Sequence, residues 1–245
     1  MKNNPAMGFN YLIRGLKLLT EPGLRLFVIV PLVVNVILFA GLVAISIQQF
    51  SSWIDSIINW LPSWLSFIAS FIEWLLWPLL IASLTIIIGY SFTILANLVA
   101  APFNSLLSEK VEEKLTGQEV AGYETMGQAL LGLPKGIARE GVKILYYLPR
   151  LLVIFILTLL MPPIAIFLWF VLGAWMMAIE YCDYPMDNHR HRFAELKTRL
   201  KAQRMTAMGF GGGVMLGTMI PIVNFIIMPA AVCGATIYWV ENLKE

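Results

Sequence analysis

The sequence predicts an all-α integral membrane protein with two long transmembrane helices, two Pro-broken re-entrant (half-penetrating) helical hairpins, and amphipathic interfacial and cytoplasmic helices. Hydrophobic residues make up 59% of the 245 residues and charged residues only 13%, and the mean hydropathy is +0.77, well above that of a soluble domain. Four stretches contain no charged residue and are each long enough to hold the about 20 residues that cross a bilayer core: residues 26–54, 74–108, 151–179 and 205–240. Prolines interrupt the last two stretches, and we expect a single membrane domain over residues 1–245.

The first 25 residues are expected to form an interfacial helix followed by a turn. Apolar residues recur at helical spacing from Phe9 to Leu19, with Arg14 and Lys17 beside them. This pattern predicts an amphipathic helix over residues 8–20 that lies in the membrane interface.

The segment from Pro22 to Arg25 has the parts of an anion site. Pro22 predicts that a helix begins here, with the backbone N–H groups of Gly23, Leu24 and Arg25 unpaired. Gly23 allows a ligand to approach the backbone, and Arg25 adds a permanent charge with several donors. A small oxyanion would fit this arrangement. The alternative is an ordinary helix start whose Arg25 extends to lipid phosphate.

Two long spans are expected next, over residues 26–48 and 74–101. Pro31 lies within the first span and is expected to kink it, and Asn35 needs a polar partner at depth. Residues 49–73 form an aromatic segment, and five of the eight tryptophans lie between Trp53 and Trp77. It is typical of an aromatic belt at a membrane interface, and a surface between protomers is the alternative.

Residues 105–150 read as cytoplasmic helices. Pro102 is expected to end the second span, and Asn104 to cap the surface helix that follows, whose charged residues would face water. Further on, Arg139, Lys143 and Arg150 share a helix face and Glu140 adjoins it. These charges are either solvated or paired with lipid, or they have a role in the entrance of a ligand.

Two re-entrant hairpins are predicted, over residues 151–181 and 205–240. The apolar run from Leu151 to Met161 spans only ~16 Å as a helix, too short for a ~30 Å hydrocarbon core. A hairpin that returns to the same face fits this length, and a single kinked span is the alternative. The second region is broken in the same way, and its glycines at four-residue steps would let it pack closely on a neighbour: Gly209, Gly213 and Gly217.

The distribution of basic residues supports this topology. Sixteen of the seventeen Lys and Arg residues fall in residues 1–25, 110–150 and 190–204, and none lies in residues 49–73. Two full spans and two returning hairpins put all the basic segments on one side, which the positive-inside rule assigns to the cytoplasm.

The basic cytoplasmic segment, residues 182–204, contains both histidines. His189 and His191 are two residues apart and face different sides of a helix, which does not favour a metal site. Asp183 or Asp187 is expected to cap a helix whose membrane side carries Leu196 and Leu200. The sequence contains no catalytic triad order, nucleophile elbow or nucleotide motif, so we expect no enzyme activity, no cofactor, no metal and no nucleic-acid partner.

The order of several short motifs resembles the CysZ-type sulfate permeases of bacteria over nearly the whole chain. These motifs are Gly15-Leu16-Lys17-Leu18-Leu19, Pro22-Gly23-Leu24-Arg25, Pro31-Leu32 with Asn35, Ala101-Pro102-Phe103-Asn104, Tyr146-Tyr147-Leu148-Pro149-Arg150, Glu180-Tyr181, Asp183-Tyr184-Pro185-Met186-Asp187-Asn188, Ile220-Pro221 with Asn224, and Met228-Pro229. The resemblance implies a multi-pass protein of the inner membrane that brings sulfate into the cytoplasm for cysteine biosynthesis. It also implies an oligomer, and a sulfate site at Gly23, Leu24 and Arg25.

We therefore expect a sulfate permease that is passive or coupled to an existing gradient. Arg139, Glu140, Lys143 and Arg150 would gate or attract the anion, and Asn35, Asn97 and Asn224 would line its pathway. The expected partners are sulfate, with sulfite or thiosulfate as further candidates, the lipid bilayer, and other copies of the chain. The alternative function is a non-transporting scaffold for a sulfur-assimilation complex.

Overall fold

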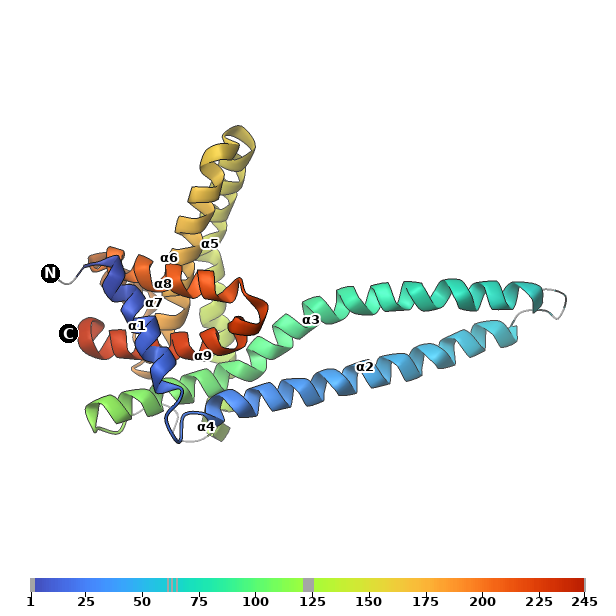
Figure 1. Cartoon of the computed structure of the whole chain (residues 1–245), viewed down its shortest axis with the longest axis horizontal. Helices are drawn as coiled ribbons and strands as arrows, with labels where there is room; N and C mark the ends of the chain where they lie inside the picture. Colours follow the sequence, from blue (N-terminus) through green and yellow to red (C-terminus); the bar gives the residue numbers. More distant parts are fainter. Residues whose placement is uncertain (1–2, 61, 63, 65, 121–125, 245) are drawn as a thin grey trace. The chain divides into compact units, whose positions relative to one another are not determined.

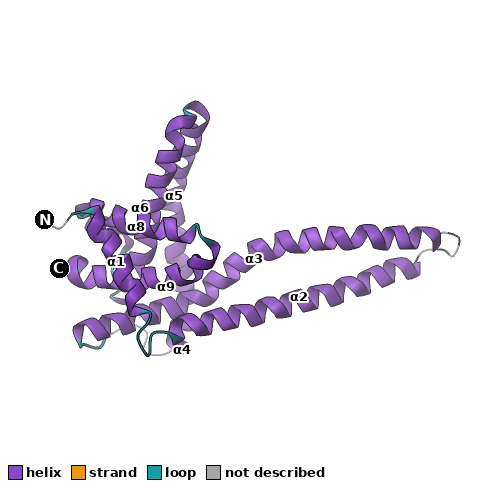
Figure 2. Ribbon diagram, viewed as in Figure 1, coloured by secondary structure: helices purple, strands orange, loops and turns teal. Residues whose placement is uncertain are grey.

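The computed structural model describes residues 3–60, 62, 64, 66–120 and 126–244, and the regular structure in these ranges is entirely helical (Figures 1 and 2). The all-α prediction is therefore confirmed. The helices are α1 (Pro5–Leu18), α2 (Leu26–Trp60), α3 (Ser66–Thr116), α4 (Met126–Leu131), α5 (Leu133–Leu160), α6 (Pro162–Asn188), α7 (Phe193–Ala202), α8 (Arg204–Thr218), α9 (Pro221–Tyr238) and a π-helical turn η2 (Trp239–Leu243).

The helices group into two compact units. One unit contains Met1–Val28 and Pro102–Glu245, and the other contains Ile29–Ala101. The chain leaves the first unit after Val28 and returns to it at Pro102, which lies inside α3. Each unit is described by itself below.

The unit formed by residues 29–101 is a helical hairpin of α2 and the first part of α3 (Figure 1). Helix α2 is 35 residues long, ~52 Å at the usual rise. It does not end near residue 48 as expected, but continues through the aromatic segment to Trp60. The ring of Phe50 on α2 meets the ring of Trp77 on α3 edge to face, with centroids 5.8 Å apart. The side chain of Trp53 is 59% exposed and that of Trp60 86%, as expected of surface in contact with lipid.

Helix α3 runs through Pro102 without a break, so the prediction that Pro102 ends it is wrong. Proline removes one backbone donor and disfavours helix at the preceding residue, and here the packing of the following turns outweighs that cost. Asn104 does not cap a helix; its amide donates to the hydroxyl of Tyr184, 3.3 Å away. Glu109 and Glu112 are buried rather than solvated.

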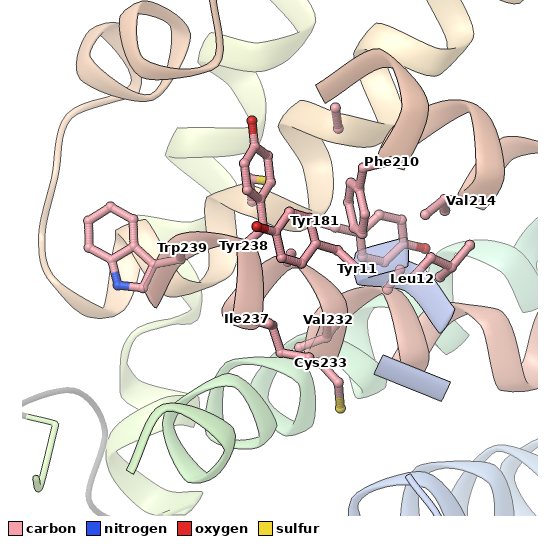
Figure 3. Close-up of a cluster of buried hydrophobic side chains, with 14 of the residues drawn as sticks. Tyr11, Leu12, Tyr181, Phe210, Val214, Val232, Cys233, Ile237, Tyr238 and Trp239 are labelled. Carbon is pink, nitrogen blue, oxygen red and sulfur yellow. The ribbon is translucent and has the colours of Figure 1, made fainter. Parts of the chain in front are cut away.

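The core of the other unit lies around α9, which packs against α1, α6 and α8 (Figure 3). The rings of Tyr11 and Tyr238 stack with centroids 5.0 Å apart, and Phe210 of α8 lies beside them. Because Tyr11 and Leu12 are almost fully buried, α1 is a core element of this unit. The predicted helix exists, with one face packed on protein, and its position in the membrane interface stays a prediction.

Glycines allow α1 to approach its neighbours closely. A Cβ atom on Gly15 would lie 2.1 Å from the carbonyl oxygen of Ala230, and one on Gly8 would lie 1.9 Å from that of Thr206. The predicted close packing of the α8 glycines is confirmed, since a Cβ on Gly209 would lie 2.0 Å from the carbonyl oxygen of Pro5. Backbone therefore meets backbone where α1 crosses α8 and α9.

Both Pro-broken regions form helical hairpins. Helices α5 and α6 turn at Met161 and run antiparallel (Figure 1), with the indole N–H of Trp169 donating to the hydroxyl of Thr158 at 3.0 Å. Helix α5 continues through residue 150, so the predicted boundary there is absent. Helices α8 and α9 turn near Ile220. Exposed apolar side chains cover the tip of the α5–α6 hairpin, whereas most of α9 is buried in protein. That either hairpin crosses only half of a membrane stays a prediction.

The segment after α6 differs from the expected capped helix. Asp183 and Asp187 lie within α6, and α7 begins after Arg192, whose side chain does not cap it. Leu196 and Leu200 are fully buried in the protein core rather than facing a membrane.

Replacing Gly15 by alanine should destabilise the protein because the new methyl group would collide with the backbone of α9. Overpacking of this kind costs about 1–3 kcal/mol or more. Gly41→Ala is the matched control, since a Cβ at Gly41 meets no atom within 4 Å and alanine favours a helix interior. Tryptophan fluorescence during thermal unfolding in detergent should show a lower midpoint for Gly15→Ala only. Equal midpoints for the two variants would contradict the close packing.

Candidate functional site

Residues 19–25 form a tight turn between α1 and α2. Leu19 and Leu24 are buried in the core cluster and anchor the two ends of the turn. Gly23 lies between them with φ +93°, a conformation that L side chains rarely adopt. A Cβ atom at Gly23 would meet nothing within 4 Å, so the backbone here is open to a ligand.

The amide groups of this turn differ partly from the prediction. Helix α2 begins at Leu26 rather than at Pro22, and the N–H of Leu24 donates to the carbonyl oxygen of Glu21 at 3.3 Å. The expectation of a free Leu24 amide is therefore wrong. Within the described part of the chain, no acceptor takes the N–H groups of Gly23, Arg25 or Leu26. These three amides stand before or at the positive end of α2.

The guanidinium of Arg25 is held over the turn. Its Nε and Nη2 donate to the carbonyl oxygen of Thr20 at 2.9 and 2.5 Å. A carbonyl carries no net charge, so this contact orients the guanidinium without neutralising it. The nearby carboxylate of Glu21 is paired with Lys114 of α3, which reduces its repulsion of an anion.

Two cations of α5 meet carboxylates of α6 in a buried cluster. Arg139 donates from Nε and Nη2 to Asp183 and from Nη1 to Asp187, at 2.6–2.9 Å. The second Nη1 donor reaches the carbonyl oxygen of His191 at 2.9 Å. Nearly all hydrogen-bond donors of the Arg139 guanidinium therefore bind the C-terminal part of α6 and the segment just after it.

Lys143 is the centre of this α5–α6 charge cluster. Its side chain is only 3% exposed, and Nζ lies 2.5 Å from a carboxylate oxygen of Glu140, 2.8 Å from one of Glu180 and 3.4 Å from one of Asp183. Two cations therefore face four carboxylates within the cluster. The carboxylates outnumber the cations here, and the expectation that Arg139 and Lys143 gate or attract the anion stays a prediction.

Sequence reasoning missed the acidic half of this cluster. Asp183 and Asp187 are four residues apart on one face of α6, and Arg139 and Lys143 are four apart on α5. The available signal was the matching i, i+4 charges on the two segments that flank the predicted hairpin of residues 151–181.

A second buried charge lies on α3. The carboxylate of Glu112 is 1% exposed and lies 2.9 Å from Nε2 of His189 and from Nζ of Lys244.

An exposed ion pair links α1 to the last residues of the chain. Arg14 donates to Glu241 through both Nη atoms at 2.6 and 3.0 Å. This hydrogen-bonded carboxylate raises the pKa of Arg14 above its ordinary value.

The other predicted residues lie apart from these clusters. Arg150 is exposed and contacts Tyr146 instead of the α5–α6 carboxylates. Asn35 in α2 and Asn224 in the first turns of α9 are both half-buried. The side chain of Asn97 lies outside the described residues. Among the residues searched, no group of His, Cys, Asp and Glu side chains could hold a metal ion.

The fold and these sites define a multi-pass α-helical membrane protein with an open amide turn before its first long helix. Four described helices are long and apolar enough to cross a membrane. The chain belongs to the family described as Sulfate transporter CysZ/Etoposide-induced protein 2.4, whose model matches residues 11–229.

Curated relatives match along almost the whole chain. A protein named Sulfate transporter CysZ from Pseudomonas aeruginosa strain LESB58 is 44% identical over 244 residues, covering 98% of each chain. Proteins of the same name from Pseudomonas syringae pv. tomato and Pseudomonas fluorescens are also 44% identical, covering 97% and 96% of this chain and 94% and 93% of theirs.

Replacing Lys143 by methionine should strongly destabilise the protein, because three carboxylates would lose their shared cation. Removing one partner of a buried ion pair costs about 3–5 kcal/mol. Lys201→Met, at an exposed position of α7, controls for the loss of a positive charge. Thermal unfolding in detergent should show a large drop in midpoint for Lys143→Met alone. The double variant Lys143→Met, Glu180→Gln should recover part of the loss, and a midpoint unchanged from wild type in Lys143→Met would refute the role of the cluster.

Proposed function

We propose that this protein is a sulfate permease that moves sulfate across the bacterial inner membrane into the cytoplasm for sulfate assimilation and cysteine biosynthesis. The observation that carries this proposal is family membership, with 44% identity over nearly the full length to proteins named Sulfate transporter CysZ. Its long apolar helices agree with a multi-pass membrane protein.

The proposed sulfate site is the turn at Gly23, Leu24 and Arg25. Sulfate is a tetrahedral dianion, and neutral amides with one guanidinium can replace part of its hydration shell. The open backbone at Gly23 and the unpaired amides of Gly23, Arg25 and Leu26 support this position. The buried side chain of Leu24 would hold the turn in place.

The α5–α6 charge cluster has a different proposed role. Arg139, Glu140 and Lys143 would keep the two arms of the hairpin together and so act as a gate. Their contacts with Glu180 and Asp183 support this role. Any gate opening that separates α5 from α6 would have to exchange these ion pairs for others.

The remaining features of transport are also proposals. Asn35, Asn97 and Asn224 would line the pathway, and sulfite or thiosulfate would compete with sulfate because they share its charge and oxygen donors. Transport would be passive or coupled to an existing gradient, and the functional form would be a homo-oligomer. No observation favours a non-transporting scaffold.

Uptake of radiolabelled sulfate into proteoliposomes tests the proposed activity. A permease should give saturable flux well above that of protein-free vesicles, and unlabelled sulfite or thiosulfate should reduce it. Leak-level flux from correctly folded protein would instead support the scaffold.

Replacing Arg25 by alanine should weaken sulfate binding by at least about 1 kcal/mol, because one charged hydrogen bond is lost. That loss corresponds to about a fivefold higher Kd. Lys17→Ala is the control, since Lys17 is an exposed cation at the end of the preceding helix. Calorimetric titration of the purified variants with sodium sulfate makes the comparison. If both variants bind like the wild type, Arg25 is not part of the site.

A further inference from the structure

Two cations converge on one aromatic ring beside the α5–α6 hairpin. The guanidinium carbon of Arg150 lies 3.7 Å from the centroid of the Tyr146 ring, and Nζ of Lys197 lies 4.9 Å from the same centroid. Nζ of Lys197 is also 5.1 Å from the ring centroid of Phe193. The two positive charges therefore come from different helices, α5 and α7, and meet around a single phenol.

The ring is fixed in place by its neighbours. Trp175 of α6 donates from its indole nitrogen to the hydroxyl of Tyr146 at 3.1 Å. Phe193, the first residue of α7, packs edge to face against the ring with centroids 5.6 Å apart. Three helices thus build this platform, so the convergence of the cations is not an accident of one flexible side chain.

Neither cation is neutralised in the described part of the protein. Arg139 and Lys143 are paired with carboxylates, but Arg150 and Lys197 contact only aromatic rings and a backbone carbonyl, that of Tyr146. Two uncompensated positive charges around one ring make the surface there electropositive and favour the approach of an anion. A tetrahedral oxyanion has the charge and the oxygen acceptors that both groups can bind.

The position of the cluster indicates which oxyanion it binds. Arg150 is the last charged residue of α5 before the apolar end of the helix, where Leu152, Val153 and Phe155 are 59%, 56% and 54% exposed. Exposed apolar side chains of this kind contact lipid tails, and Arg, Tyr and Trp at their boundary lie at the depth of the head groups. The side chain of Arg150 is itself exposed, so a lipid can reach the cluster from the side.

We propose that Arg150 and Lys197, arranged around Tyr146, bind the phosphate group of an anionic phospholipid. The proposal concerns a lipid site and does not depend on the sulfate pathway. It separates Arg150 from the gate residues Arg139 and Lys143.

Native mass spectrometry of the full-length protein with added phosphatidylglycerol tests this site. The double variant R150Q/K197Q should retain about thirtyfold less phosphatidylglycerol, as expected for the loss of two cations near an anionic head group. K201Q/R204Q is the matched control, because it removes two exposed charges from the neighbouring segment of α7 and α8. Phosphatidylcholine retention should be equal in all three proteins.

One further variant and one competition experiment distinguish a lipid site from general attraction of charge and from a second sulfate site. Y146L preserves both charges but removes the platform, so it should also lower phosphatidylglycerol retention, and size-exclusion chromatography confirms that each variant is folded. In the competition experiment, sodium sulfate is added to the wild-type protein with bound lipid, up to the concentration that saturates sulfate uptake into proteoliposomes. Retained lipid supports the phospholipid assignment, whereas displacement by sulfate at that concentration overturns it in favour of a second cargo site. Equal loss of lipid in R150Q/K197Q and K201Q/R204Q would also overturn the proposal, because attraction would then follow total charge.

Discussion

The close approach of α1 to α8 and α9 is the constraint on which the unit of residues 1–28 and 102–245 depends. Gly8, Gly15 and Gly234 leave no room for side chains at these crossings, so the helix axes are brought together by backbone contact. This contact places Tyr11 against Tyr238. The turn at Gly23 then follows with Leu24 buried in the same core. An open amide turn therefore rests on a rigid base, and its one exposed cation is positioned by a carbonyl of the turn itself.

Sequence patterns predicted the helices well and their ends poorly. Long apolar runs give a strong signal for a helix, and the hairpin break at Pro162 was read correctly because two adjacent prolines cannot continue a helix interior. Pro102 carried the same local signal, yet α3 passes through it. The difference lies in the surroundings: residues after Pro102 bury Leu106, Leu107 and Val111 in the core, and this tertiary packing favours continuing the helix. Local propensity contains no information about that packing.

The candidate site shows the same limit. The residue types alone single out Gly23 and Arg25 as a possible anion site, because a glycine and a cation precede a long apolar run, but they leave open an ordinary helix start. The pairing of Arg139 with Asp183 required knowing that α5 and α6 lie antiparallel at a particular register. Glu112 was predicted to face water for a related reason. Its partners, His189 and Lys244, are far away in sequence, and no periodicity within α3 could indicate them.

The partners of the cations explain how the charges are divided between structure and binding. Arg139 and Lys143 face carboxylates in a buried setting, so their charges are cancelled locally and serve to hold α5 to α6. Arg25, Arg150 and Lys197 contact carbonyl oxygens or aromatic rings, which orient a cation but leave its net charge in place. The charges of the first group are therefore paired within the fold, whereas those of the second remain available to pair with an anion. The proposed binding and the proposed gate can therefore be tested by separate substitutions, since they rest on cations with different kinds of partner.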